Sequence, residues 1–269
     1  MPPSIQLVLL DLDGVLYVED EPVAGAVEAV ERLRGGGLAL RFVTNTTSRS
    51  RPATLDKLRG LGFPVEADEL VTPAALAVRH CLDQGHRRVS LLMNEEVKGD
   101  FAALEEDDEH PDAVIVGDLG EDFAYPVLNR AFRHVMDGAE LIALQRNRFW
   151  LRADGLSLDV GPFVAALEYA TAREAYVVGK PAGGFFREVL SEADALPDAA
   201  AMVGDDIETD VGGALRAGLT AILVRTGKYR SDAVAASGIE PTTTVDSIAD
   251  VPAALGLHNE RTNPGRDRE

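Results

Sequence analysis

The sequence has little cysteine and no long apolar run. Its 269 residues include a single cysteine, Cys81, so an internal disulfide is excluded, and the apolar neighbours of Cys81 favour a buried structural position over a nucleophile. No apolar run reaches the roughly 18 residues that a membrane-spanning helix needs. The first residues also lack the basic start of a secretory signal. We therefore expect a cytoplasmic protein that has no membrane as a partner.

Positive charge is scarce as well. Asp and Glu number 45 against 26 Lys and Arg, which gives a formal net charge of -19 at pH 7. Such a field repels nucleic acid, so we expect no nucleic-acid partner. Only four basic residues are lysines, namely Lys57, Lys98, Lys180 and Lys228. This composition fits a salt-rich cytoplasm, where screening weakens self-repulsion, and it fits an ordinary solvated acidic surface equally well.

Short apolar runs alternate with amphipathic segments along the chain. The alternation predicts a β-α-β order and an α/β protein with a largely parallel sheet. The predicted strands cover residues 5–10, 38–43, 89–93, 113–116, 141–144, 175–178, 200–203 and 220–224. The predicted helices cover residues 25–33, 74–82, 125–136, 162–172 and 185–193.

Four of the predicted strands end in a polar cluster. The clusters are Asp11-Leu12-Asp13-Gly14, Thr44-Asn45-Thr46-Thr47, Gly179-Lys180-Pro181 and Gly204-Asp205-Asp206. Ligands of open α/β sheets bind beyond the carboxyl ends of the strands, so we expect the four clusters to meet at one crevice. Residues 73–172 contain strands and helices but no such cluster, and we predict an inserted second domain there. The core is then formed by residues 1–72 and 173–257, and we expect residues 258–269 to be a disordered polar tail.

The first cluster ends an apolar strand on paired negative charge. An ionised carboxylate is costly to desolvate, so Asp11 and Asp13 need a cation, a proton or a reaction to serve. Mg²⁺ prefers oxygen ligands, and the acidic turn of residues 204–210 can supply a further carboxylate from far along the chain. Beside such a cation Asp11 can stay ionised and attack phosphorus, forming an aspartyl-phosphate, while Asp13 is placed to protonate the leaving oxygen.

The two middle clusters supply what a phosphoryl group needs. Its nonbridging oxygens carry negative charge, so the site requires hydrogen-bond donors and a positive charge besides the metal. The Thr44 hydroxyl, the backbone around Asn45 and the Lys180 ammonium meet this need. Taken one at a time, each of the four clusters is also explained as a turn, a helix cap or a surface loop. Their occurrence together in this order favours the functional interpretation.

In this order the four motifs resemble those of the haloacid dehalogenase superfamily of phosphohydrolases, over nearly the whole chain. The inserted domain, the run TNTTSRSR and the GKP motif resemble subclass IIA, whose members carry an α/β cap. Within it, the stretches RFVTNTTSRSR, GPFVAALEYAT and DDIETDVGGA are most similar to the branch called haloacid dehalogenase-like hydrolase domain-containing protein 2. The resemblance implies a Rossmann-like parallel-sheet core with an inserted α/β cap domain of the C2 type, and it makes a homodimer formed through the cap an expectation.

The resemblance also implies a role for each matching residue. Asp11 would be the nucleophile and Asp13 the acid and base. Mg²⁺ would be held by the Asp11 carboxylate, the Asp13 backbone carbonyl and Asp205. The phosphate would be held by Thr44, the Asn45 amide and Lys180. Asp206 and Asp210 would orient these residues without binding the metal or the phosphate themselves.

We therefore predict a Mg²⁺-dependent phosphatase that hydrolyses a small phosphomonoester. The main alternative is a phosphomutase, which needs the same two aspartates but returns the phosphate to its substrate. A phospho-receiver module is a much shorter chain and does not need Asp13, and a non-catalytic scaffold does not need the full set of side chains.

The inserted domain offers candidates for substrate recognition. Residues 145–148 (Gln-Arg-Asn-Arg) follow a predicted strand, and donors at a strand end commonly take part in recognition. We expect Arg146 or Arg148 to contact the substrate, and the alternative is that both arginines pair with carboxylates of the cap. The pair Gly227-Lys228 lacks the glycine spacing of a P-loop, so we do not predict a phosphate-binding loop there.

Overall fold

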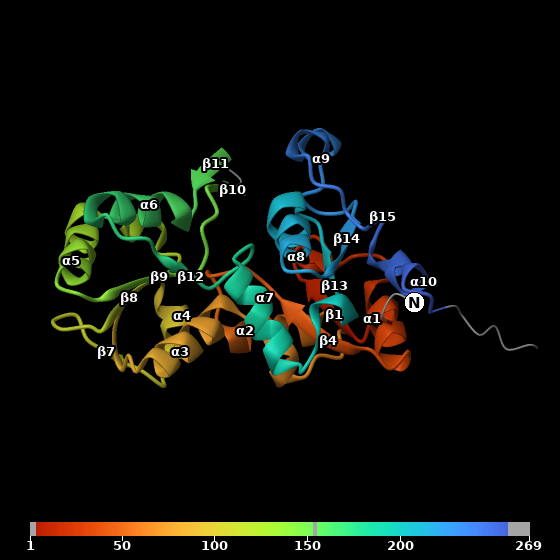
Figure 1. Cartoon of the computed structure of the whole chain (residues 1–269), viewed down its shortest axis with the longest axis horizontal. Coiled ribbons are helices and arrows are strands. Elements are labelled where there is room, and N and C mark those ends of the chain that lie inside the picture. The colour runs from red at the N-terminus through yellow and green to blue at the C-terminus, as the bar shows by residue number, and fades with distance from the viewer. Residues whose placement is uncertain (1–3, 153–154, 258–269) are drawn as a thin grey trace, which may run out of the picture.

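The computed structural model describes residues 4–152 and 155–257. Figure 1 shows two groups of elements, each built around its own parallel sheet and joined by the segments before α3 and α7. The tail predicted for residues 258–269 lies outside the described residues. Within the described ranges, no helix has both the length and the apolar character that a membrane crossing requires.

The first sheet has six parallel strands in the order β15-β14-β13-β1-β4-β5. Its strands are β1 (Leu7–Asp11), β4 (Ala39–Val43), β5 (Leu70–Val71), β13 (Ala200–Gly204), β14 (Thr220–Val224) and β15 (Thr243–Val245). The central strand β1 pairs with β13 on one side and with β4 on the other. Asp11 lies opposite Val43, and Leu10 lies opposite Val203. The carboxyl ends of these three strands therefore lie at one edge, as the polar clusters predict.

Helices cover both faces of this sheet (Figure 1). They are α1 (Ala26–Gly35), α2 (Arg51–Gly60), α7 (Gly183–Glu192), α8 (Gly213–Arg216), α9 (Ser231–Ser237) and α10 (Val251–Ala254). Side chains alternate along a strand, so Leu7 and Leu9 of β1 join one hydrophobic cluster, whereas Val8 and Leu10 join another. All four leucine and valine side chains are fully buried, which explains the continuous apolar run before Asp11.

The second sheet has five parallel strands in the order β12-β9-β8-β6-β7. They are β6 (Arg88–Leu92), β7 (Glu105–Glu106), β8 (Ala113–Val116), β9 (Glu140–Ala143) and β12 (Tyr176–Val177). The elements packed around this sheet are the helices α3 (Pro73–Gln84), α4 (Glu95–Lys98), α5 (Tyr125–Met136) and α6 (Val160–Thr171) and the hairpin of β10 (Phe149–Arg152) and β11 (Gly155–Leu158). A second short hairpin, of β2 (Tyr17–Val18) and β3 (Glu21–Pro22), follows β1 of the six-stranded sheet. An apolar cluster runs from β1 through α7 and α3 to β8, so the two sheets share one buried core. The protein thus has the α/β fold that the sequence predicts.

One predicted strand lies in a different sheet from the one expected. The sequence predicts that residues 175–178 belong to the core, but Tyr176 and Val177 pair in parallel with Ile142 and Ala143 of β9. This strand cannot pair with β1, because β13 and β4 already pair with the two edges of β1. The chain therefore returns to the six-stranded sheet after Val178, and we propose a division into core and cap with this later boundary.

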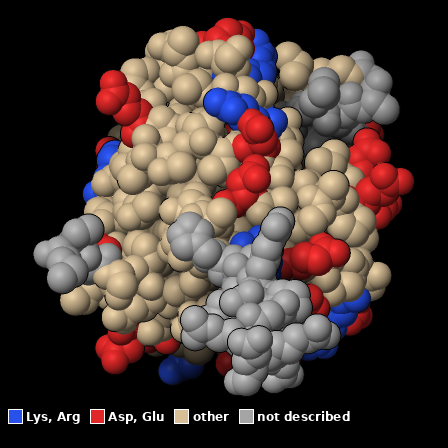
Figure 2. All heavy atoms as spheres, turned by 90° about the vertical axis from the view of Figure 1, so that its right-hand side faces the viewer, with Lys and Arg blue, Asp and Glu red and all other residues tan. Residues whose placement is uncertain are grey.

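Charged side chains are dispersed on the end of the molecule that faces away from the second sheet. On the coloured part of that face, Lys and Arg lie among Asp and Glu and among uncharged residues (Figure 2).

Candidate active site

Three buried carboxylates meet at the carboxyl edge of the six-stranded sheet. Asp11 ends β1, Asp205 follows β13 directly, and Asp210 lies in the π-helical turn Ile207–Gly212. One oxygen of each lies within 4.8 Å of an oxygen of the other two. Their relative exposures are 9%, 2% and 1%, so water solvates this negative charge very little.

Lys180 supplies a positive charge in direct contact with this cluster. Its Nζ lies 2.6 Å from Asp11 Oδ1 and 2.7 Å from Asp210 Oδ1, and its side chain is buried. Desolvation alone would lower the pKa of Lys180, but the attraction of Asp11 and Asp210 outweighs it and raises the pKa above the ordinary value. Lys180 is therefore charged at neutral pH.

The loop after β4 holds Lys180 in place. The Asn45 side-chain Nδ2 donates to the Lys180 carbonyl at 2.8 Å, and the Lys180 backbone N–H donates to Asn45 Oδ1 at 2.8 Å. A Cβ on Gly179 would lie 2.8 Å from Asn45 Oδ1, so only glycine allows this approach. Lys180 thus reaches the core site although the strand before it belongs to the second sheet.

Asp205 is oriented by one oxygen and leaves the other without a partner. Its Oδ2 accepts a hydrogen bond of 2.7 Å from the Lys228 backbone N–H. Its Oδ1 is buried and has no hydrogen-bond partner among the described residues. Burial raises the pKa of Asp205, and the carboxylates of Asp11 and Asp210 raise it further. An unpaired buried carboxylate oxygen of this kind is suited to a cation.

Two glycines make room for Asp205. Gly14 and Gly227 have φ values of +82° and +60°, which L-residues with a side chain rarely adopt. A Cβ on either glycine would collide with Asp205 Oδ2. The Thr226 hydroxyl also donates to the Gly14 carbonyl, so the loop after β14 is tied to the turn after β1.

Asp13 and Thr44 lie beside the cluster but not within it. Asp13 is exposed, and its Oδ2 accepts from the Tyr17 hydroxyl and from the Thr46 hydroxyl, each at 3.3 Å. Burial raises the pKa of Tyr17, and the Asp13 carboxylate raises it further, so the phenol stays protonated and able to donate. Thr44 is buried, and its Oγ1 accepts from the Thr46 backbone N–H at 2.9 Å.

The two acids of the last motif differ in their surroundings. Asp206 Oδ1 accepts from the backbone N–H groups of Glu208 and Thr209, both at 2.9 Å, which makes it the cap of the following turn. Asp210 belongs to the carboxylate cluster and contacts Lys180. The structure therefore brings together Asp11, Asp205, Asp210 and Lys180, places Asp13, Thr44 and Asn45 next to them, and uses Asp206 as a structural cap.

The loop of Thr226, Gly227 and Lys228 is part of the site, although its sequence matches no phosphate-binding motif. Gly227 makes room for the Asp205 carboxylate and the Lys228 N–H donates to it, so a P-loop pattern does not describe this loop. A usable signal was present, since the loop follows β14 and therefore lies at the same carboxyl edge as the other clusters.

Of the two arginines in residues 145–148, Arg146 meets one of the two expectations, and the contact of Arg148 corresponds to neither. Arg146 Nη2 lies 2.8 Å from Glu168 Oε2, which is the pairing with a cap carboxylate that was the alternative to substrate binding. The Arg148 guanidinium lies 5.8 Å from the centre of the Phe149 ring. Gln145 is buried and donates to Asp159 Oδ1, so it has a structural role.

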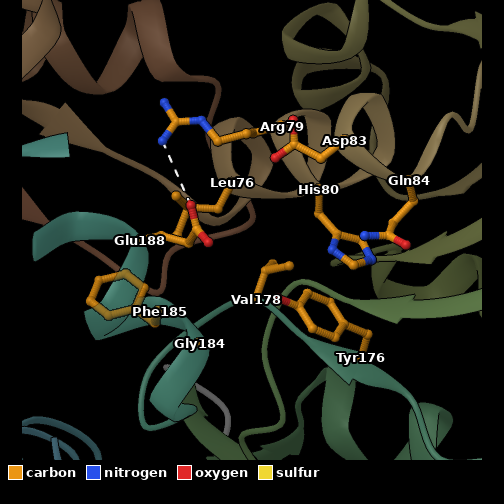
Figure 3. A pocket seen from close by; sticks show the side chains of 10 residues that line it. All are labelled: Leu76, Arg79, His80, Asp83, Gln84, Tyr176, Val178, Gly184, Phe185 and Glu188. Atoms are coloured by element: carbon orange, nitrogen blue, oxygen red, sulfur yellow. Dashed lines mark ion pairs between the residues drawn. The ribbon is translucent and has the colours of Figure 1, made fainter. Parts of the chain in front are cut away.

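A separate cavity lies at the junction of the two sheets. It has a volume of about 220 Å³ and is bounded by side chains of α3, β12 and α7 (Figure 3). In that view the Arg79 side chain points across the cavity towards Glu188, at an N–O distance of 3.8 Å, and Arg79 also pairs with Glu192. His80 stacks on Tyr176 with ring centres 3.8 Å apart. None of the clustered carboxylates lines this cavity, so the candidate active site is the strand-end cluster.

Comparisons with known proteins identify the family of the chain. The family model described as haloacid dehalogenase-like hydrolase matches residues 8–105, and a second model of HAD-like hydrolases matches residues 177–251. The human protein called haloacid dehalogenase-like hydrolase domain-containing protein 2 is 46% identical over 228 residues, which cover 85% of this chain and 87% of that protein.

Two solved structures are similar over most of the chain. The 4-nitrophenylphosphatase of Thermotoga maritima has a TM-score of 0.86 at 28% identity and covers 93% of this chain and 97% of its own. The glycerol phosphate phosphatase of Mycobacterium tuberculosis, solved in complex with magnesium, has a TM-score of 0.79 at 30% identity and covers 91% of this chain and 76% of its own.

Proposed function

The chain belongs to the haloacid dehalogenase-like hydrolase family and is a phosphatase, and from this premise we propose that the strand-end cluster is its active site, that Mg²⁺ is its cofactor and that Asp11 carries the phosphoryl group during turnover. The observation that carries the proposal is the buried group of Asp11, Asp205 and Asp210, which Lys180 contacts as a cation. Within the part of the chain that the structure describes, one oxygen of Asp205 has no hydrogen-bond partner.

The donor set supports a hard divalent cation. Three carboxylates against one lysine leave a negative excess, and carboxylate and carbonyl oxygens are the ligands that Mg²⁺ prefers. The ligands would be the Asp11 carboxylate, the Asp13 backbone carbonyl and Asp205. When bound, the cation neutralises this excess and polarises the phosphoryl oxygens of the substrate. The magnesium complex of the similar glycerol phosphate phosphatase is consistent with this choice.

Asp11 is held in an orientation that suits a nucleophile. Lys180 holds the Asp11 carboxylate through Oδ1, and this carboxylate would attack phosphorus. The new bond joins Asp11 to phosphorus while the bond from phosphorus to the leaving oxygen breaks. Water then attacks the aspartyl-phosphate, and the bond between Asp11 and phosphorus breaks to release inorganic phosphate.

Asp13 would move the protons in both steps. It is exposed and therefore accessible to the leaving group, and the hydroxyls of Tyr17 and Thr46 fix its carboxylate. Asp13 gives its proton to the leaving oxygen in the first step and accepts a proton from the attacking water in the second.

The remaining residues bind the phosphate or position those that do. The Thr44 hydroxyl, the Asn45 backbone N–H and the Lys180 ammonium would contact its oxygens. The Asn45 side chain is already engaged with the Lys180 backbone, so Asn45 also positions Lys180. Asp210 positions the Lys180 ammonium, and Asp206 caps the turn that carries Asp210.

The residues of the second sheet would form the cap that selects the substrate. Because the resemblance is to relatives that associate through this part, a homodimer formed through the cap stays a prediction, as does a cytoplasmic location.

The direct test is phosphate release from p-nitrophenyl phosphate by the wild-type protein with Mg²⁺ and with a chelator. We expect turnover only with Mg²⁺, and we expect Asp11→Asn to abolish it because a neutral amide cannot attack phosphorus. Asp246→Asn is the matched control, since Asp246 pairs with Arg225 at the surface. Mass spectrometry of acid-quenched protein should find the phosphoryl group on the peptide that contains Asp11. Undiminished turnover in the chelator or in Asp11→Asn would refute the assignment, and transfer of phosphate to a second substrate position would identify a phosphomutase.

A further inference from the structure

Lys228 differs from the other three lysines in having no ion pair among the described residues. Lys57 pairs with Asp20 at 3.1 Å, Lys98 with Glu106 at 2.8 Å, and Lys180 with Asp11 at 2.6 Å. The Lys228 side chain is exposed, and its ammonium makes neither an ion pair nor a hydrogen bond within residues 4–152 and 155–257. An unpaired cation is unexpected in a protein with a net charge of -19.

A backbone hydrogen bond fixes where Lys228 lies along the chain's path around the site. Its N–H donates to Asp205 Oδ2 at 2.7 Å, so the residue borders the carboxylate cluster. A lysine ammonium is charged at neutral pH, so Lys228 brings a positive charge to this border.

Lys228 and Lys180 border the site at different points. Lys180 contacts Asp11 and Asp210, where the transferred phosphoryl group would bind. The loop of Thr226, Gly227 and Lys228 is tied to the turn after Asp13, because the Thr226 hydroxyl donates to the Gly14 carbonyl and Gly227 lies close to Gly14. The leaving group must lie near Asp13 if Asp13 protonates it. The backbone of Lys228 thus lies in a loop on the leaving-group side of the site, and its flexible four-carbon side chain is long enough to reach a group that is bound there.

We propose that Lys228 binds a second anionic group, carried by the leaving-group part of the substrate. The enzyme then prefers phosphate esters whose alcohol part bears a carboxylate or a further phosphate over esters of a neutral alcohol. This inference rests on the proposed phosphatase function and on the assignment of Asp13 as the acid. A hydrogen bond between an ammonium and an anion changes binding on the order of tenfold, which is sufficient to select between such substrates.

Three substrates with a two-carbon leaving group test the proposal. They are 2-hydroxyethyl phosphate, which is neutral beyond its phosphate, 2-phosphoglycolate, which carries a carboxylate, and ethylene glycol bisphosphate, which carries a second phosphate. We expect the wild-type kcat/KM to be higher for one or both anionic substrates, and the substrate with the larger gain identifies which anion Lys228 binds.

The variants are Lys228→Met, which keeps the backbone N–H but removes the charge, Lys228→Arg, which keeps the charge, and the control Lys98→Met. Lys98 pairs with Glu95 of α4 and Glu106 of β7 and lies outside the site. Lys228→Met should raise KM for the preferred anionic substrate on the order of tenfold and change the neutral substrate much less. Lys228→Arg should retain the preference, and Lys98→Met should behave as wild type.

Each alternative outcome has a defined meaning. An equal loss for all three substrates, no loss for any, or no wild-type preference for an anionic substrate would overturn the role of Lys228 while leaving the phosphatase function intact. A loss of Mg²⁺ affinity in Lys228→Met, measured by calorimetry, would likewise overturn it, because the residue would then act through Asp205. A wild-type protein that releases phosphate neither from these substrates nor from p-nitrophenyl phosphate would instead refute the proposed function.

Discussion

Replacing Gly227 by alanine should weaken magnesium binding by displacing Asp205. Gly227 has a φ of +60°, and an added Cβ would collide with Asp205 Oδ2, the oxygen that accepts from the Lys228 N–H. Either Asp205 or the loop must move. Since Asp205 is a proposed ligand whose orientation depends on this hydrogen bond, we expect Gly227→Ala to lower Mg²⁺ affinity by roughly 10- to 100-fold, the usual effect of disturbing a group that orients a ligand.

The same substitution has a separate cost in stability. An alanine in the left-handed region costs about 1–2 kcal/mol relative to glycine. Gly238 allows this cost to be measured alone, because its φ is +66° and nothing lies within 4 Å of the position that its Cβ would take. Gly238→Ala should therefore lower the free energy of unfolding by about the same 1–2 kcal/mol and leave Mg²⁺ affinity unchanged.

The assay is a calorimetric titration with Mg²⁺ together with urea unfolding, carried out on the wild type and both alanine variants. The difference between the two variants separates the collisions of the added Cβ, with Asp205 Oδ2 and with Gly14 Cα, from the backbone strain. Wild-type Mg²⁺ affinity in Gly227→Ala, or an equal loss of affinity in Gly238→Ala, would refute the reasoning that Gly227 makes room for a metal ligand.

Two further predictions concern a binding residue and a titrating surface group. Asn45→Ala removes both 2.8 Å hydrogen bonds that hold the Lys180 backbone. It should therefore lower the free energy of unfolding by about 2 kcal/mol and raise KM for p-nitrophenyl phosphate. Unchanged steady-state kinetics would contradict the role of Asn45 in positioning Lys180. Backbone N–H groups of Arg88 and Arg87 lower the pKa of Asp112 from 3.8 to about 2, so its stabilising contribution is complete above pH 3.8 and is lost as the pH falls to about 2. Asp112→Asn should remove this part of the acid dependence of urea unfolding, and an identical acid dependence in the variant would exclude the effect.

Much of the fold and the site follows from local sequence patterns. The run before Asp11 is continuously apolar because β1 is buried on both faces, and this pattern can be read without coordinates. The meeting of Asp11 with Asp205 could also be predicted, since parallel strands place their carboxyl ends at one edge of a sheet whatever the distance along the chain. The strands β5 and β15 were not predicted, because two or three residues are too few to show a period.

The partners of individual side chains were decided only by tertiary structure. The strand before Lys180 pairs in the second sheet, yet the two hydrogen bonds between Asn45 and the Lys180 backbone hold Lys180 at the core site. Lys228 reaches Asp205 because two glycines let three loops approach closely. A sequence pattern records which face of a strand is buried and where the strand ends, since these depend on neighbouring residues. It does not record which sheet edge is vacant or which loops touch, because those contacts depend on how distant parts of the chain pack together.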